Sequence, residues 1–136
     1  MTERVERASE LHLRGYNCAQ AVACAFADAA GADEREVFRM TEAFGFGLGC
    51  MQGTCGALVG ACAIAGLMSS DANLENPGSK RLTYKASARM VERFRERVGD
   101  IVCGVIKGRT GGPVLMPCHD CVIIAAEIVE EELFSN

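Results

Sequence analysis

The residues best suited to chemistry in this 136-residue chain are its eight cysteines. In a reducing compartment, such a number favours metal binding, redox chemistry or burial of cysteine as a small apolar side chain. Four of them lie where predicted helices begin: Cys18, Cys55, Cys103 and Cys118. The unpaired N–H groups and the positive dipole end of a helix N-terminus favour a thiolate over a thiol. These four cysteines are therefore the first candidates for a redox or metal site.

A further cysteine follows Cys118 at the spacing of a CxxC motif, Cys118-His119-Asp120-Cys121. This spacing suits both a shared metal ion and an intramolecular disulfide. His119 is a candidate metal ligand or proton carrier because it lies between the two thiols in sequence. Cys50, in a glycine-rich segment shortly before Cys55, is a candidate extra ligand or resolving thiol. Two cysteines fall within apolar helical faces, where we expect them only to pack: Cys24 and Cys62.

The elements that must position these thiols are predicted to be helices separated by glycine. Asn17 with Gln20 forms a capping-box pattern, so the second helix begins at Cys18. Thr54, Ser79 and Asp100 are further candidate caps. By residue number, we expect helices over 2–14, from 18 through the apolar run that ends at 30, over 33–43, from 55 onward, over 79–98, over 100–107 and over 118–134.

The helix that follows Thr54 carries Gly56, Gly60 and Gly66 with alanines between them. Small residues at helical spacing let another backbone approach closely, which is typical of a central helix. Strand-like alternation is scarce along the whole chain. The sequence therefore predicts an all-α fold: one compact domain over residues 1–136, with about five to seven helices around a buried Gly/Ala-rich central helix.

Charge and composition limit the partners and the compartment. The net charge is −4 and the 14 basic residues are scattered, which argues against nucleic-acid binding. The uncharged stretch 43–70 is interrupted by glycines and has no aromatic belt, so we expect a buried helix and no membrane span. The charged first residues lack the apolar run of a secretory signal, and we expect a cytoplasmic protein. The small-residue helix also allows a homodimer.

Several of these residues together resemble a bacterial and archaeal family of proposed redox-active proteins, C_GCAxxG_C_C, which is named after its cysteine pattern. The resemblance rests on Tyr16-Asn17-Cys18-Ala19-Gln20-Ala21-Val22, on Cys55-Gly56-Ala57-Leu58-Val59-Gly60, on Cys103 and on the helix that starts at Cys118. It implies that the family cysteines are Cys18, Cys55, Cys103 and Cys118. We expect Cys50 and Cys121 to be additions of this chain.

Three functional hypotheses follow, and whether the protein is an enzyme stays open among them. In the first, the thiols of Cys18, Cys55, Cys103 and Cys118 bind an iron–sulfur cluster, or an iron or zinc ion, for electron transfer or redox sensing with an unidentified partner protein. Further ligands of that site are Cys50, Cys121 and His119. In the second, Cys118 and Cys121 are catalytic thiols of a thiol–disulfide oxidoreductase or peroxidase. In the third, the protein is a non-catalytic helical interaction protein whose cysteines only pack.

Overall fold

Side-chain caps set the starts of the first three helices in the computed structural model, which describes residues 1–135. Thr2, Asn17 and Asp33 each accept a hydrogen bond from a backbone N–H in the first turn that follows. At Asn17, the Gln20 side chain bonds back to the backbone N–H, so the predicted capping box is present. The helices that begin there are α1 (Glu3–Leu13), α2 (Cys18–Phe26) and α3 (Glu34–Thr41).

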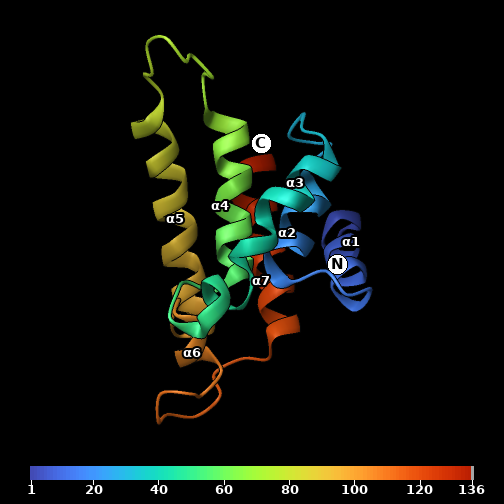
Figure 1. Ribbon diagram of the computed structural model, residues 1–136, viewed down its shortest axis with the longest axis vertical. Helices are drawn as coiled ribbons and strands as arrows, with labels where there is room; N and C mark the ends of the chain where they lie inside the picture. Colours follow the sequence, from blue (N-terminus) through green and yellow to red (C-terminus); the bar gives the residue numbers. More distant parts are fainter. Residues whose placement is uncertain (136) are drawn as a thin grey trace.

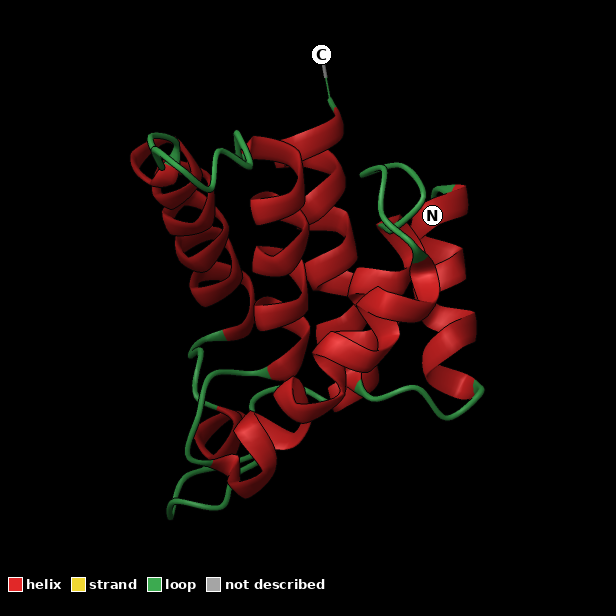
Figure 2. Cartoon of the chain, turned by 45° about the horizontal axis from the view of Figure 1, so that its top comes forward, coloured by secondary structure: helices red, strands yellow, loops and turns green. Residues whose placement is uncertain are grey.

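The rest of the described chain is also helical. The remaining helices are α4 (Gly56–Ser69), α5 (Lys80–Val98), α6 (Cys103–Ile106) and α7 (Cys118–Val129), with the short helical turns η1 (Glu42–Phe44), η2 (Gly47–Met51) and η3 (Glu130–Phe134). Within residues 1–135 the only β-type pairing is a single bridge between Thr54 and Val102, and Figure 2 shows helices joined by loops. The predicted all-α fold is confirmed. The predicted single domain extends to Asn136, which lies outside the described residues.

Three predicted caps are used differently in the structure. Asp100 accepts hydrogen bonds from the N–H groups of Ile101 and Val102, and the helix predicted to start there begins only at Cys103, with Val102 as the N-cap of α6. Thr54 is held in the bridge to Val102, so Cys55 takes the N-cap position of α4. Ser79 occupies the N-cap position of α5, but its hydroxyl accepts a hydrogen bond from the N–H of Asp71 in the preceding loop. The differences at Thr54 and Ser79 arise from contacts with residues outside the helix concerned. The residue pattern of a single helix cannot predict such contacts.

The Gly/Ala-rich helix α4 lies at the centre, between α2, α5 and α7 (Figure 1). Its close packing depends on the absence of side chains, because a Cβ on Gly60 would lie 2.5 Å from the carbonyl oxygen of Ala19 in α2. Ala86, Met90, Phe94 and Val98 of α5 are buried as the helical period predicts. Leu82 follows the same helical period, which predicts an inward-facing side chain, but it is 63% exposed because it lies in the first turn of α5, near the loop.

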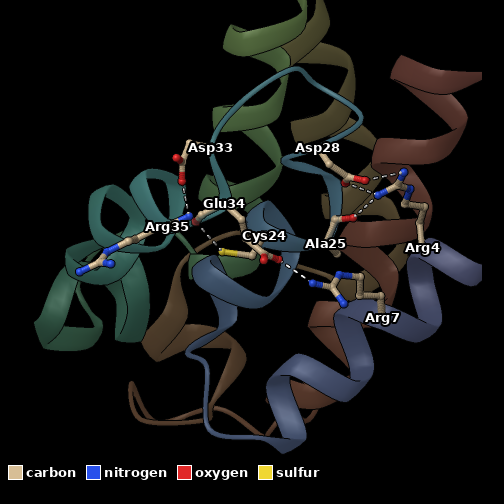
Figure 3. Close-up of polar contacts among 8 residues, drawn as sticks. All are labelled: Arg4, Arg7, Cys24, Ala25, Asp28, Asp33, Glu34 and Arg35. Atoms are coloured by element: carbon tan, nitrogen blue, oxygen red, sulfur yellow. Dashed lines mark hydrogen bonds and ion pairs between the residues drawn. The ribbon is translucent and has the colours of Figure 1, made fainter.

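Ion pairs tie the periphery to this core. Arg7 of α1 pairs with Glu34 at 2.7 Å, and Arg4 pairs with Asp28 just after α2 (Figure 3). Exposed pairs of this kind each contribute about 0–1 kcal/mol, so they orient α1 more than they stabilise the fold. A bilayer-crossing helix would have to be longer and more apolar than any found in the described part of the chain.

Candidate functional site

Four thiols from three helices lie together where α2, α4 and α7 begin; Figure 1 shows these three helices packed side by side. Cys18 is the first residue of α2, Cys55 the N-cap of α4, and Cys118 the first residue of α7. The thiol of Cys18 is hydrogen-bonded to Cys118, and that of Cys55 to Cys121. We call these four residues the thiol cluster. The spatial convergence that helix starts alone left open is thus present for three of the four predicted cysteines, with Cys121 as the fourth member.

Cys18 and Cys118 form a pair in which one sulfur holds the proton and the other the charge. The pKa of Cys118 is lowered to about 5, first because Cys18 donates a hydrogen bond to its thiolate and then because the Lys107 ammonium is beside it. The same hydrogen bond, together with burial, raises the pKa of Cys18. The pair therefore contains a thiolate near neutral pH, and that sulfur is the nucleophile of thiol chemistry.

Lys107 is a functional residue that sequence inspection missed. It follows α6 directly, hydrogen-bonds to the Cys118 thiolate, and that contact raises the pKa of Lys107. Its ammonium also lies 5.2 Å from the centre of the Phe46 ring, a cation–π arrangement. A lysine one helical turn after Cys103 is the only sequence signal for this role, and such a spacing is too common to be informative.

Cys55 and Cys121 form the second pair of the thiol cluster. Here the pKa of Cys55 is lowered, first by a hydrogen bond from Cys121 and then by backbone N–H groups of Ala57 and Leu58 in the first turn of α4. This is the effect expected of a thiolate at a helix N-terminus. The pKa of Cys121 is raised by its hydrogen bond to Cys55 and by burial. The cluster thus contains two hydrogen-bonded thiol pairs, in each of which one pKa is lowered and the other raised.

Cys103 lies beside the cluster and is buried. Its backbone N–H donates to Gly53, and the N–H of Cys55 donates to Ile101, so the short bridge before α4 and α6 holds the two cysteines next to each other. Burial raises the pKa of Cys103, and Lys107 opposes that shift. Cys103 therefore lies next to the thiol pairs, and its raised pKa favours the neutral thiol over the thiolate.

The glycine-rich turn η2 covers Cys103, and Cys50 lies on it. A Cβ on Gly47 would lie 2.5 Å from the Cβ of Cys103, and three non-glycine residues adopt positive φ: Phe46, Leu48 and Met51. Each such residue costs of the order of 1 kcal/mol, and strain of this kind concentrates at functional sites. Cys50 is exposed, and its thiol faces the Gly47 carbonyl at 3.7 Å.

Two cysteines lie away from the cluster, as the apolar pattern predicts. Cys24 is buried in α2, and its thiol faces the Glu34 carbonyl at 3.8 Å (Figure 3). Burial raises its pKa to about 11. Cys62 is half-buried in α4 and hydrogen-bonded to Ser87 of α5, and burial raises its pKa as well. Both are neutral thiols that pack between helices.

The two histidines meet beside the Cys18–Cys118 pair. His12 of α1 has its Nε2 atom 3.7 Å from the sulfur of Cys18. His119 contacts His12, with 2.7 Å between the two Nδ1 atoms, and its Nε2 atom lies 2.9 Å from Ser9 Oγ. The predicted ligand His119 is therefore linked to the thiols through His12.

The cluster has the donor chemistry of an iron or zinc site, since thiolates bind both metals. Its sulfurs are arranged as hydrogen-bonded pairs, however. In residues 1–135, no three or more His, Cys, Asp and Glu side chains form a group that could hold one metal ion. The residues as positioned do not fit a bound ion, and the chemistry below uses the thiols alone.

Comparison with known proteins gives one match. A family model described as "Putative redox-active protein (C_GCAxxG_C_C)" matches residues 16–132, which include every member of the thiol cluster. No curated protein and no solved structure matches the chain. The family predicted from the cysteine spacing is confirmed.

Proposed function

Because the chain belongs to the C_GCAxxG_C_C family, we propose that it is a thiol–disulfide redox protein in which Cys118 attacks a disulfide substrate and Cys18 resolves the product. The observation that carries this proposal is the hydrogen bond from the Cys18 thiol to the Cys118 thiolate, beside the Lys107 ammonium. An attacking thiol needs thiolate character and access, and Cys118 is half-buried at the start of α7.

The exchange runs in two balanced steps. The Cys118 thiolate forms a bond to one sulfur of the substrate disulfide, which breaks, and the other substrate sulfur leaves as a thiolate. Cys18 then loses its proton and attacks the Cys118 sulfur, which releases the second substrate thiolate. The protein is oxidised by two electrons to a Cys18–Cys118 disulfide, and the substrate disulfide is reduced to two thiols.

Cys121 is the competing resolving thiol, since the CxxC spacing favours it. Its proton is engaged with Cys55, so the contacts favour Cys18 as the partner of Cys118. In the Cys55–Cys121 pair, too, one pKa is lowered and the other raised. We propose that the Cys55–Cys121 pair can also form a disulfide, which would supply two further electrons after the Cys18–Cys118 pair is oxidised.

Disulfide mapping tests this proposal. Fully reduced protein is oxidised with glutathione disulfide, free thiols are alkylated, and peptides are identified by mass spectrometry. We expect a Cys18–Cys118 bridge that is absent in Cys118→Ser and unaffected in Cys24→Ser, whose sulfur lies outside the cluster. A Cys118–Cys121 bridge as the first product would overturn the assignment of Cys18. Retention of all eight thiols would overturn the function.

The iron–sulfur cluster or metal ion stays a prediction beside this proposal: the thiols are suitable donors, but as positioned in residues 1–135 they do not form a site for a single ion. It is tested by iron, zinc and sulfide analysis with visible absorption after purification without air. Stoichiometric iron and sulfide that disappear in Cys18→Ala but persist in Cys24→Ala would give these thiols a ligand role instead of an exchange role. Metal-free, colourless protein that still exchanges disulfides is the outcome that the proposal expects.

A further inference from the structure

We propose that His12 is the base that removes the proton from Cys18, and that His119 and Ser9 carry this proton to the surface. The inference rests on the proposed function, because it concerns the second step of the exchange. It starts from an unbroken line of contacts: Cys18 Sγ to His12 Nε2 at 3.7 Å, His12 Nδ1 to His119 Nδ1 at 2.7 Å, and His119 Nε2 to Ser9 Oγ at 2.9 Å.

The second step needs such a base. In the resting pair the Cys18 proton is shared with the Cys118 thiolate. Once Cys118 is bonded to substrate, that acceptor is gone, and Cys18 is a half-buried thiol that must ionise before it attacks. Lys107 faces Cys118 as a donor and does not serve as an acceptor. His12 presents a ring nitrogen to the sulfur, so it is the group positioned to take the proton.

The two rings are set to pass a proton in one direction. A 2.7 Å contact between two Nδ1 atoms requires one proton between them, with one ring donating and the other accepting. When His12 Nδ1 donates, its Nε2 is free to accept from Cys18, and His119 Nδ1 accepts from His12. The second nitrogen of His119 then donates to the Ser9 hydroxyl. This arrangement satisfies every polar atom of the line with neutral rings.

Transfer along the line moves one proton outward and keeps both rings neutral. The Cys18 proton goes to His12 Nε2, the His12 Nδ1 proton goes to His119 Nδ1, and the His119 Nε2 proton leaves through Ser9 to solvent. Cys18 becomes a thiolate, bonds to the Cys118 sulfur and expels the substrate thiolate. Burial and the neighbouring His119 lower the pKa of His12, which keeps the ring able to accept.

A packing role is the alternative explanation of this pair. The rings are stacked, with centroids 5.0 Å apart and an angle of 24° between their planes, and they join α1 to α7. Packing alone requires shape at these positions, whereas a relay requires a nitrogen that accepts a proton. Variants that separate shape from proton acceptance therefore decide between the two.

Rapid mixing with dithiobis(nitrobenzoate) of reduced protein that carries Cys50→Ser and Cys55→Ser, which remove the exposed thiol and the reactive thiol of the second pair, separates the two steps, because each then releases one coloured thiolate. Attack by Cys118 gives the first release, and resolution by Cys18 gives the second. In His12→Ala we expect the second release to slow by about a hundredfold, the range of a lost general base, and the first to change by less than about threefold. Added imidazole should restore much of the second rate, whereas pyrazole, a ring of the same shape with a far weaker basic nitrogen, should not.

Three further variants complete the test. His12→Asn keeps a planar polar side chain without a basic nitrogen, and it should be as slow as His12→Ala. His119→Ala, which removes a positioning residue, should slow the second release by about tenfold, and Ser9→Ala by less than about twofold, because water replaces a surface hydroxyl. Circular dichroism and the urea midpoint report whether each variant is folded. If His12→Ala does not fold, His12→Asn takes its place in the test.

The outcomes distinguish this inference from the function on which it rests. A two-phase reaction whose second phase is unchanged in His12→Ala and His12→Asn would overturn the relay and leave the exchange intact. A slowed second phase that imidazole does not restore in His12→Ala would overturn it in favour of packing. A single release in the protein that carries only Cys50→Ser and Cys55→Ser, or two unaltered releases when Cys118→Ser is added to it, would instead overturn the proposed function.

Discussion

At the scale of single residues, the chemistry of Cys118 depends on its neighbours more than on its helix. The helix start at Cys118 predicts a stabilised thiolate, and the pKa of that thiol is indeed lowered to about 5. The main causes, however, are the hydrogen bond from Cys18 and the nearby Lys107. Backbone N–H groups make their contribution at Cys55 instead. Position at a helix start thus identifies the candidate cysteines, and tertiary contacts determine which of their pKa values are lowered.

The lowered pKa of Cys118 predicts a pH profile for its alkylation. The thiolate is present above its pKa, so the iodoacetamide rate at Cys118 should stay high near neutrality and fall by half near pH 5 as the solution is acidified. In urea-unfolded protein the midpoint should return to about 8.5, the value of a free cysteine. Peptide mapping after brief alkylation at each pH measures this. A midpoint above about 8 in the folded protein would contradict the thiolate assignment.

Lys107 should contribute to this thiolate through its charge. Lys107→Met removes the ammonium that hydrogen-bonds to Cys118, so the pKa of Cys118 should rise and its alkylation near pH 6 should slow by about tenfold, as expected for a shift of about one pKa unit. Lys85→Met, which removes an exposed charge on α5, is the matched control and should have no effect. Equal rates in the two variants would show that the Cys18 hydrogen bond alone holds the charge.

At the scale of elements, the helix patterns were informative wherever a helix is defined by its own residues. The capping box at Asn17 and the inner face of α5 after its first turn are present as predicted. Thr54 was predicted as a cap, but it pairs with Val102, and that pairing moves the start of α4 by one residue. The contact joins segments almost fifty residues apart in the sequence, so no local pattern contains it.

The contact between α2 and α4 predicts opposite effects for two glycines of one helix. Gly60→Ala places a Cβ 2.5 Å from the Ala19 carbonyl oxygen, so the helices must separate, and we expect a loss of about 1–3 kcal/mol in the free energy of unfolding. Gly66→Ala meets no atom within 4 Å, and it should gain up to about 1 kcal/mol from helix propensity. Urea unfolding followed by circular dichroism measures both. A stabilising Gly60→Ala would contradict the close approach of the two helices.

At the scale of the whole molecule, the sequence predicted which cysteines are candidates for the thiol cluster, but not which of them lie next to each other. Its sulfurs come from α2, α4 and α7, and their pairing depends on how these helices pack. The candidate cysteines could be identified from the predicted helix starts and the family pattern. The pairing of Cys18 with Cys118, the place of Cys121 beside Cys55 and the contact of His12 were not, because each joins distant parts of the chain.

Oxidation should therefore stabilise the whole fold. A Cys18–Cys118 bridge closes a loop of about 100 residues, for which the loss of chain entropy in the unfolded state amounts to at most about 5 kcal/mol. We expect the urea midpoint of the oxidised protein to exceed that of the reduced protein, whereas Cys18→Ala should give equal midpoints with and without oxidant. A lower midpoint on oxidation would indicate that the bridge distorts the helix starts.

The convergence of α2, α4 and α7 also sets when the protein becomes reactive during its own synthesis. Chains fold from the N-terminal side as they leave the ribosome. A nascent chain that has exposed α1 to α5 carries Cys18 and Cys55 but lacks both Lys107 and the sulfurs of α7. Cys18 in such a chain therefore lacks Cys118 and Lys107, the residues with which it forms the thiolate-containing pair of the complete protein. The Cys118 thiolate therefore arises only when the last helix has emerged and docked, and the growing chain lacks this nucleophile until its synthesis is almost complete.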